Sequence, residues 1–214
     1  MSSAGAYWSG LDPTIPRPAP VLILVRHGRT AVNASGRLQG RADPPLDANG
    51  VAQAEALRAV LPEQATVISS PLQRARQTAE VVSAGRPIQI DGRWVELDYG
   101  EWDGLPLEGV PAREWARWRS DPSYRPPGGE TLQECGARVR LACEDLSELA
   151  RSEDVIVVSH VSPIKAAVAW ALGAGDETSW RMFLGVAAIC RVAVTDRGPS
   201  LRSFNELGHL DQRS

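Results

Sequence analysis

The sequence has few cysteines and no long apolar run, and both absences narrow the class of protein. Its three cysteines, Cys135, Cys143 and Cys190, cannot pair evenly and lie at no metal-ligand spacing. We therefore expect buried free thiols in a reducing compartment. The longest early apolar run, residues 21–25, is too short for a signal peptide or a membrane span. These features predict a cytoplasmic protein.

An excess of charge of either sign is also missing. The 23 Lys and Arg residues against 26 Asp and Glu residues give a formal net charge of −3. No basic surface therefore points to nucleic acid or to a membrane as a partner. Hydrophobic residues make up 43% of the 214 residues, which is enough for a folded core in one domain or at most two small ones.

What the sequence does contain is an alternation of short aliphatic runs with helical patterns. Residues 1–19 are rich in proline and are predicted to be a flexible or extended arm, followed by one domain over 20–214. Strands are predicted at 21–25, 67–68, 88–90 and 155–158, and helices at about 50–61, 111–119, 131–149 and 162–172. Residues 187–204 are predicted to form two antiparallel strands. We expect an α/β three-layer sandwich, with a mostly parallel central sheet, helices on both faces and an antiparallel edge.

Two helix starts carry capping signals. Thr131 and Glu134 form a predicted capping box, and Ser70 and Gln73 form another around Pro71. The second start places Arg74 in the first helical turn, where free N–H groups attract anions. A surface arginine on an amphipathic helix would give the same pattern.

Two of the three histidines directly follow aliphatic strands. His27 comes after Arg26, and His160 ends the run 155–160. Ligands of open α/β sheets bind beyond the carboxyl ends of the strands, so we expect both imidazoles at one binding edge. Gly28 lets the backbone approach a ligand, and Arg26 offers a planar fork for phosphate oxygens. The alternative is a structural histidine held by hydrogen bonds at a strand end.

Together these groups describe an anion pocket with a nucleophile and an acid. A neutral His27 would attack, and Arg26, Arg74 and His160 would neutralise phosphate oxygens. Glu96 would donate a proton to the leaving oxygen and then take one from water. A solvated loop carboxylate is the alternative for Glu96.

Five ordered blocks resemble the histidine phosphatase superfamily, in its phosphoglycerate-mutase-like branch. They are residues 26–30 with Asn33, 69–79, 96–104, 128–131 and 157–160, and residues 205–210 also look familial. The resemblance implies that His27 is phosphorylated in the intermediate, with Arg26, Arg74 and His160 around the phosphate and Glu96 as the proton donor. It also implies a small helical cap insertion at about 102–130.

Further substrate contacts follow from the same resemblance: Asn33, Gln39, Gly28, Thr30 and Val161. No metal and no cofactor are expected. Many relatives have glycine where this chain has Val161, whose backbone N–H is still able to bind phosphate. The Val161–Pro163 variant is similar to alpha-ribazole-phosphatase-like domains.

The family includes hydrolases and mutases. Mutases resembling it usually have arginine after the acidic glutamate and a long insertion before the Gly-Glu block. Here Leu97 follows Glu96, and only 25 residues separate Trp102 from Gly128. We therefore predict a metal-independent phosphomonoester hydrolase acting on a small phosphorylated metabolite. The alternatives are a cofactor-dependent phosphoglycerate mutase and a non-catalytic phosphate-ligand-binding protein. A homodimer is the default expectation from symmetry statistics.

The predicted cap is rich in aromatic residues: Trp94, Trp102, Trp115 and Trp118. They could form walls for a ring-bearing or apolar substrate, or simply pack a small subdomain. The arginines at positions 113, 117 and 119 could meet a second anionic group, or form a solvated helix face.

Overall fold

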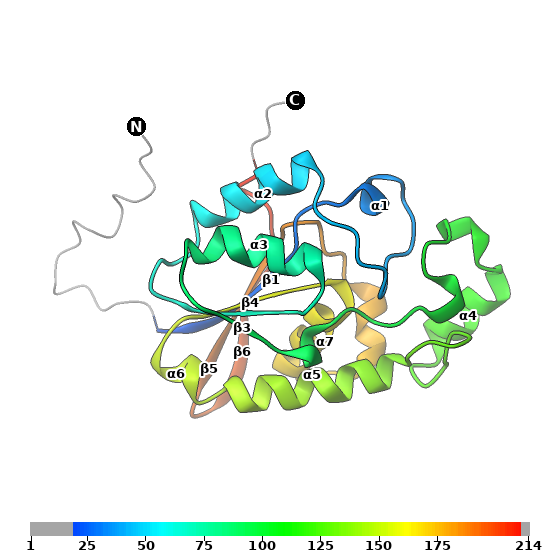
Figure 1. Ribbon diagram of the computed structural model, residues 1–214. Coiled ribbons are helices and arrows are strands. Elements are labelled where there is room, and N and C mark those ends of the chain that lie inside the picture. Colours follow the sequence, from blue (N-terminus) through cyan, green and yellow to red (C-terminus); the bar gives the residue numbers. More distant parts are fainter. Residues whose placement is uncertain (1–18, 211–214) are drawn as a thin grey trace, which may run out of the picture.

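The computed structural model describes residues 19–210, and within them one sheet has the strand order β3-β2-β4-β1-β5-β6 (Figure 1). The strands are β1 Val21–Arg26, β2 Thr66–Ser69, β3 Ile88–Ile90, β4 Val155–Ser159, β5 Ile189–Thr195 and β6 Gly198–Glu206. Strands β1 to β4 pair in parallel, whereas β5 runs antiparallel to β1 and to β6. The predicted mixed sheet with an antiparallel edge is confirmed. The predicted arm at 1–19 lies outside the described residues, except for Ala19.

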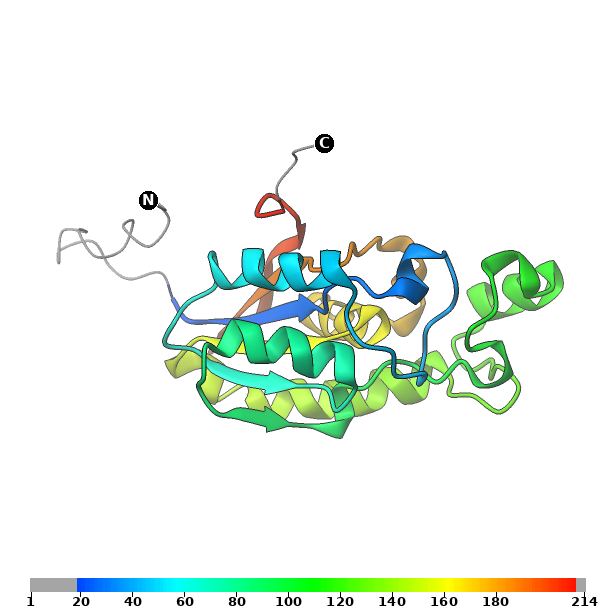
Figure 2. The same ribbon diagram turned by 45° about the horizontal axis from the view of Figure 1, so that its top comes forward.

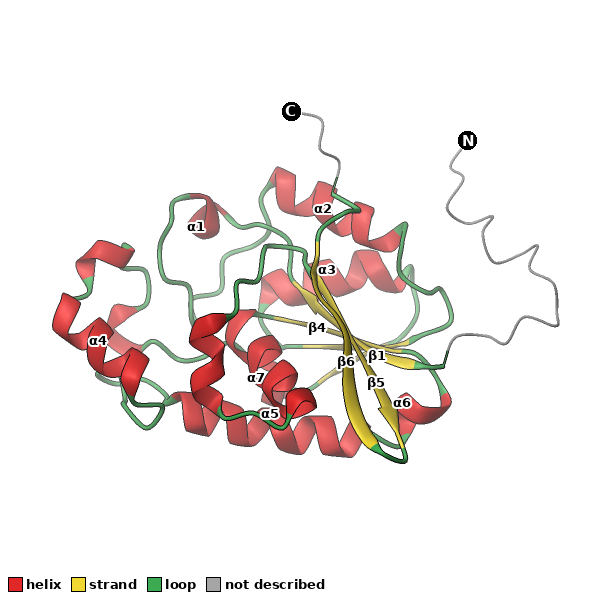
Figure 3. Ribbon diagram, turned by 180° about the vertical axis from the view of Figure 1, so that it is seen from behind, coloured by secondary structure: helices red, strands yellow, loops and turns green. Residues whose placement is uncertain are grey.

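Helices cover both faces of the sheet. Helices α2 (Ala48–Arg58) and α3 (Gln73–Ser83) lie on one face, and α5 (Leu132–Leu146), α6 (Leu149–Ser152) and α7 (Val161–Leu172) lie on the other (Figures 1 and 3). Successive side chains of a strand point to opposite faces. Ile23 and Val25 therefore belong to the core under α2 and α3, whereas Leu22 and Leu24 belong to the core under α5 and α7. Burial on both faces explains why β1 is aliphatic from Val21 to Val25.

The capping box predicted for α5 is confirmed. The Thr131 hydroxyl accepts a hydrogen bond from the Glu134 backbone N–H at 3.0 Å, and the Glu134 carboxylate accepts one from the Thr131 N–H at 3.0 Å. Helix α7 begins at Val161, directly after β4, with His160 as its N-cap residue. The short connection fixes His160 between a buried strand and a buried helix.

The predicted start of α3 is wrong. The helix begins at Gln73, and its N-cap residue, Leu72, makes no side-chain capping bond. The Gln73 N–H instead donates to Asp43 at 2.6 Å, and the Ser70 hydroxyl contacts His160 Nε2 at 2.7 Å. Partners far along the chain have replaced the local capping box.

The segment predicted as the cap insertion contains the 3₁₀ turn η3 (Leu107–Gly109) and helix α4 (Ala112–Ser120). In Figure 2 the arrows of β1 to β3 point toward the side of the molecule on which α4 stands. The predicted division into an arm, a domain and this insertion stays a prediction. The helix α1 (Ala31–Ala34) and the turns η1 (Gly92–Trp94), η2 (Gly100–Trp102) and η4 (Asp176–Arg181) complete the described elements.

Aromatic rings join α4 to the body of the protein. Trp118 lies 5.3 Å from Trp115 and 4.9 Å from Trp180 between ring centroids, and Trp102 lies 5.5 Å from Trp118. Trp94 lies apart from this aromatic cluster, completely buried in the core under α5 and α7. The cluster therefore packs the segment.

The three arginines of α4 lie on its outer side or over the rings. Arg113 and Arg117 form exposed ion pairs with Glu114. The Arg119 guanidinium lies over the Trp115 and Trp180 rings. These contacts favour the solvated-face reading for Arg113 and Arg117 over a second anion site.

The three cysteines are free and buried, as predicted. Among the described residues, no helix has both the length and the apolar character needed to cross a membrane.

Candidate active site

His27 and His160 meet at the carboxyl edge of the sheet. Strands β1 and β4 are parallel neighbours, with Arg26 opposite Ser159, so the residue that follows each strand reaches the same edge. The two imidazole centroids are 5.0 Å apart, and both side chains are buried. The sequence-based expectation that these histidines share one edge is confirmed.

The ring of His27 is oriented by its own neighbour. Its Nδ1 lies 2.7 Å from the Gly28 carbonyl oxygen, which accepts a hydrogen bond only from a protonated Nδ1. The Nε2 atom then keeps its lone pair, and Arg74 Nε donates to it at 3.2 Å. Burial, followed by the charges of Arg74 and Arg26, holds the pKa of His27 well below its ordinary value. His27 is therefore a neutral imidazole with an acceptor nitrogen.

Arg74 is completely buried and held by the loop before α2. Its Nη1 donates to the Ala42 carbonyl at 2.7 Å, and its Nη2 donates to the Gly40 carbonyl at 2.8 Å. Burial lowers the pKa of Arg74 but leaves the guanidinium charged at neutral pH. The fork geometry is thus fixed in place beside His27.

The second guanidinium comes from the last residue of β1. Arg26 Nη1 donates to the Leu184 carbonyl at 2.7 Å. Burial lowers its pKa to about 10, which still leaves the group charged at neutral pH. The fully buried guanidinium of Arg74 and the partly buried one of Arg26, beside a neutral imidazole, make an environment that favours an anion.

His160 acts as a neutral hydrogen-bonding group. Its Nε2 contacts the Ser70 hydroxyl at 2.7 Å, and burial together with the charge of Arg74 holds its pKa well below the ordinary value. The predicted contribution of His160 to a phosphate site is therefore a hydrogen bond rather than a positive charge.

Glu96 is buried at the N-terminus of α7. Its carboxylate accepts hydrogen bonds from three backbone N–H groups: Leu97 at 2.7 Å, Val161 at 3.0 Å and Ser162 at 3.1 Å. The positive end of the helix stabilises this carboxylate. The structure thus brings Glu96 next to His160. The backbone N–H of Val161, which was predicted to bind phosphate, donates to Glu96 instead.

Thr30, Asn33 and Gln39 form one hydrogen-bonded group. Gln39 Oε1 accepts from the Thr30 hydroxyl and from Asn33 Nδ2, both at 2.8 Å, and Thr30 and Asn33 form the capping box of α1. Gly28 sits where a Cβ atom would meet the Gly50 carbonyl oxygen at 2.4 Å, and its N–H donates to Thr78. Only glycine allows that close approach of two backbone segments.

Three buried polar atoms of the predicted site have no hydrogen-bond partner among the described residues: Arg26 Nε, Gln39 Nε2 and His160 Nδ1. A buried polar group without a partner costs about 1–3 kcal/mol. An anion bound among them would supply acceptors for the donors. This is the chemistry expected of a phosphate pocket.

Several residues around this edge carried no usable signal in the sequence. Ser70 was assigned to a helix cap but contacts His160. The Arg138 guanidinium binds Glu130 at 2.7 Å and reaches the Glu96 carbonyl at 3.4 Å. The Ser70–His160 and Arg138–Glu96 contacts join positions more than forty residues apart in the sequence. The Arg138–Glu130 pair spans eight residues.

A cavity of about 110 Å³ adjoins the predicted site. Its apolar walls come from Leu38, Tyr99, Trp115, Trp118, Leu132 and Trp180. Leu97 and Val161, the direct neighbours of Glu96 and His160, line it as well. Of the four predicted tryptophans, Trp115 and Trp118 both pack the segment and line this cavity, and their role as walls for a substrate stays a prediction.

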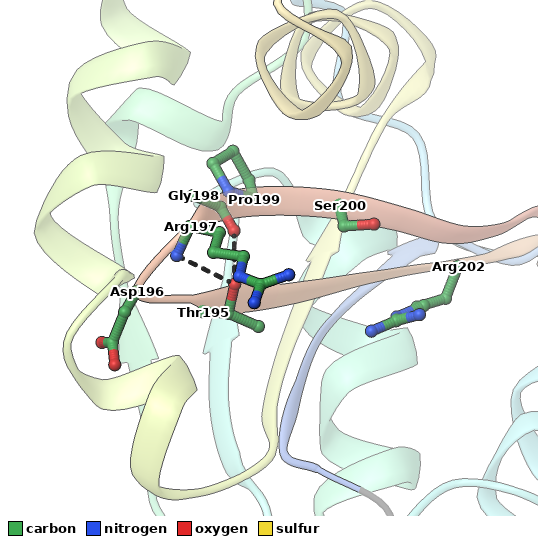
Figure 4. A pocket seen from close by; sticks show the side chains of 7 residues that line it. All are labelled: Thr195, Asp196, Arg197, Gly198, Pro199, Ser200 and Arg202. Carbon is green, nitrogen blue, oxygen red and sulfur yellow. Dashed lines mark hydrogen bonds between the residues drawn. The ribbon is translucent and has the colours of Figure 1, made fainter.

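A second hollow, of about 520 Å³, lies on the turn of the β5–β6 hairpin between Thr195 and Arg202 (Figure 4). Ala193, close to this turn, pairs with Val21 at the start of β1, so the hollow lies at the opposite sheet edge from His27. None of the predicted site residues lines it.

No group of three or more His, Cys, Asp or Glu side chains able to hold a metal ion occurs within residues 19–210. The expectation that no metal takes part stays a prediction.

Comparison with protein families gives one model over most of the chain: the histidine phosphatase superfamily (branch 1) matches residues 22–207. A bifunctional protein of Mycobacterium tuberculosis is 36% identical over 214 residues, covering 95% of this chain. The chain spans only 57% of that relative's length.

Two relatives are covered over almost their whole length. Phosphoserine phosphatase 1 of Hydrogenobacter thermophilus is 30% identical over 199 residues, which cover 89% of this chain and 94% of that protein. Adenosylcobalamin/alpha-ribazole phosphatase of Escherichia coli is 30% identical over 192 residues, covering 86% and 95%.

A solved structure has the same fold. A phosphoserine phosphatase variant of Entamoeba histolytica, in complex with phosphoserine, superposes with a TM-score of 0.83 at 26% identity. The match covers 89% of this chain and 99% of that one.

Proposed function

Because the chain belongs to branch 1 of the histidine phosphatase superfamily, we propose that it hydrolyses a small phosphomonoester through a phosphohistidine intermediate. The observation that carries the proposal is the state of His27. It is a buried, neutral imidazole whose Nε2 lone pair faces the fixed Arg74 guanidinium. A neutral nitrogen is a nucleophile, and the adjacent cation binds the group that it attacks.

In the first step, His27 Nε2 forms a bond to phosphorus while the bond from phosphorus to the ester oxygen breaks. Arg26 and Arg74 bind the equatorial oxygens, where charge is spread in the transition state. Ser70 donates its hydroxyl hydrogen to His160 Nε2, so that Nδ1 carries a proton and donates to the same phosphoryl group. A protonated Glu96 transfers its proton to the leaving oxygen, and the alcohol departs.

In the second step, water attacks the phosphohistidine. The Glu96 carboxylate takes a proton from the water, the phosphorus–nitrogen bond breaks, and His27 regains its lone pair as inorganic phosphate is released. Asn33, Gln39, Thr30 and the Gly28 backbone are proposed to line the phosphate's remaining side. Gln39 Nε2, which is buried without a partner among the described residues, is the donor of this group that best supports the assignment.

Hydrolysis is proposed over phosphoryl isomerisation. Leu97 follows the acid, where similar mutases usually have arginine, and the segment around α4 is short. A mutase must keep its phosphohistidine from water, and a shorter segment over the site makes that harder. The relatives named as phosphoserine and alpha-ribazole phosphatases are consistent with hydrolysis.

The deciding experiment is hydrolysis of p-nitrophenyl phosphate in EDTA by the wild type and by His27→Ala. We expect metal-independent turnover by the wild type and a loss of at least ~10⁴-fold in the variant, since the nucleophile is absent. His209→Ala, which removes the third histidine, is the matched control and should retain activity. Turnover that survives His27→Ala would refute the nucleophile assignment.

The two alternative functions give different results. Isomerisation of 3-phosphoglycerate without release of phosphate would select a mutase. Saturable phosphate binding without turnover of any phosphomonoester would select a non-catalytic binder.

We also propose a cytoplasmic location and a homodimer. Three unpaired buried thiols support a reducing compartment. Cell fractionation tests the location, and light scattering of the purified chain tests the dimer.

A further inference from the structure

The cavity beside Glu96 continues from the catalytic edge toward α4. Leu97 and Val161 lie where it meets the site, and Tyr99, Trp118 and Trp180 are among its walls. Glu96 is the proposed donor to the leaving oxygen, and the two residues that line the cavity here, Leu97 and Val161, both bind its carboxylate through their backbone N–H groups. The cavity is therefore the space available to the leaving group.

One cation lines this aromatic cavity. Lys165 lies one helical turn after Val161 on α7, on the same helix face. It is the only lysine among the 23 Lys and Arg residues of the sequence. No hydrogen bond or ion pair involves its ammonium within the described part of the chain, whereas each arginine of α5 is paired with a carboxylate.

The electrostatic surroundings of Lys165 favour the binding of an anion beside its ammonium group. Burial lowers its pKa, the nearby Glu96 raises it, and the nearby Arg26 lowers it. Glu96 already accepts three backbone hydrogen bonds, one from Leu97 and two from the start of α7. A partly desolvated ammonium without a direct partner is stabilised when a carboxylate binds it.

The volume of the cavity suits a small leaving group. A cavity of about 150 Å³ accepts one benzene molecule. A volume of about 110 Å³ therefore accommodates a group of three or four carbons.

We propose that Lys165 and this cavity bind a small leaving group that carries a carboxylate, so that the preferred substrates are phosphorylated hydroxy acids or amino acids of three or four carbons. This inference rests on the proposed function. Lys165 selects the substrate by binding its carboxylate, and Tyr99 and Trp118 exclude water from the short carbon chain.

The test compares 3-phosphoglycerate with glycerol 3-phosphate, which has a hydroxymethyl group in place of the carboxylate. Phosphoserine and phosphoethanolamine form a second pair. We expect Lys165→Met to lower kcat/KM by about 10- to 100-fold for each carboxylate ester and by less than about 3-fold for its partner, because only the former loses a charged hydrogen bond. The loss should fall mainly on KM.

Two control variants separate a specific effect from a general one. Lys165→Arg keeps the charge and should keep part of the preference for the carboxylate esters. Arg119→Met removes a cation that lies over Trp115 and Trp180 but does not line the cavity, and should leave the preference unchanged. Equal losses on both members of a pair, or faster turnover of adenosine 5′-monophosphate than of 3-phosphoglycerate, would overturn the proposal.

Failure of this inference is distinguishable from failure of the proposed function. Hydrolysis of p-nitrophenyl phosphate with no preference between paired esters would overturn only the carboxylate site.

A binding measurement tests the carboxylate site even if the protein hydrolyses none of these esters. Reductive ¹³C-methylation labels Lys165 and the chain's α-amine alone, and the Lys165→Arg variant assigns the two signals. The Lys165 signal should shift with 3-phosphoglycerate and not with glycerol 3-phosphate, and the absence of any shift would contradict the site.

Discussion

Arg74 contributes geometry as well as charge. Its three donor atoms reach His27 Nε2, the Gly40 carbonyl and the Ala42 carbonyl, all from a side chain with no exposed surface. A lysine ammonium cannot reproduce this planar arrangement. We expect Arg74→Lys to lower kcat/KM by about 10²-fold or more, as loss of a transition-state donor does. Steady-state kinetics with p-nitrophenyl phosphate measures it.

The matched control is Arg76→Lys, two residues along the same helix and exposed. It should leave kcat/KM within about twofold of the wild type, since exposed substitutions have small effects. Near-normal kinetics for Arg74→Lys would place Arg74 outside the phosphate pocket.

The contribution of Glu96 to the rate of hydrolysis is expected to be larger for poorer leaving groups. An alkyl alkoxide needs a proton to depart, whereas p-nitrophenolate does not. Glu96→Gln should therefore slow an alkyl phosphate about 10²- to 10⁴-fold and p-nitrophenyl phosphate much less. Measured kcat values for both esters decide this.

Glu101→Gln, an exposed carboxylate on the same loop, serves as the control and should affect neither ester. Equal losses for the two esters in Glu96→Gln would count against Glu96 as the acid. Such a result would instead indicate damage to the start of α7, whose first N–H groups Glu96 binds.

At the level of elements, helix α5 holds the loop that carries Glu96. Arg138 on α5 binds both oxygens of Glu130, at 2.7 and 3.0 Å, and donates to the carbonyls of Arg93 and Glu96. Both side chains of the ion pair are mostly buried. Arg138 is therefore a positioning residue for the loop.

Arg138→Met should lower the free energy of unfolding by about 2–3 kcal/mol, somewhat less than for a fully buried pair. It should also lower kcat for alkyl phosphates about tenfold while changing p-nitrophenyl phosphate turnover less, because it displaces the acid rather than the nucleophile. Urea unfolding and kcat for the two esters provide the readouts.

Arg140→Met removes the neighbouring ion pair to Asp176, which joins α5 to the turn η4. This control should lose stability without any dependence on the leaving group. The same dependence in both variants would refute a positioning role for Arg138.

Elements with local signals were predictable from the sequence. The aliphatic runs of β1 and β4, and the Thr131 capping box of α5, depend on residues near one another in the chain, and all three predictions are confirmed. The start of α3 was not predictable. Ser70 has the chemistry of a cap, but His160, ninety residues on, binds its hydroxyl, and Asp43 pairs with the Gln73 N–H.

The same distinction applies to the site. His27 and His160 were identifiable because each follows a buried strand of a parallel pair. Lys165 and Trp180 gave no signal, because a lone lysine in a helix and a tryptophan in a turn reveal nothing about the cavity that they share. Their role follows from how α4, α7 and η4 pack together.

At the level of the whole molecule, the buried histidines make stability depend on pH. The pKa values of His27 and His160 lie well below their ordinary value near 6.5 in the folded state. As pH falls below about 6.5, the unfolded chain binds protons that the folded protein does not, so stability is present above this pH and is lost below it. Each imidazole contributes about 1.4 kcal/mol per pH unit in that range.

The free energy of unfolding should therefore fall by about 2–3 kcal/mol between pH 7.5 and pH 5.5. Urea denaturation at pH 7.5, 6.5 and 5.5 measures this change. His27→Gln should reduce the drop by about half, and the half-buried His209 adds a smaller loss in the same direction. A flat profile across this interval would show that the two imidazoles ionise as readily in the folded protein as in the unfolded chain.

His27, Arg74, Glu96 and His160 come from four separate connections of the sheet, and no two of them are neighbours in the sequence. A chain emerging from denaturant can regain helix content early and still have no working centre. Activity therefore returns only after the last of these segments has packed against the others. During refolding, the recovery of turnover should lag behind every spectroscopic signal that reports a single segment.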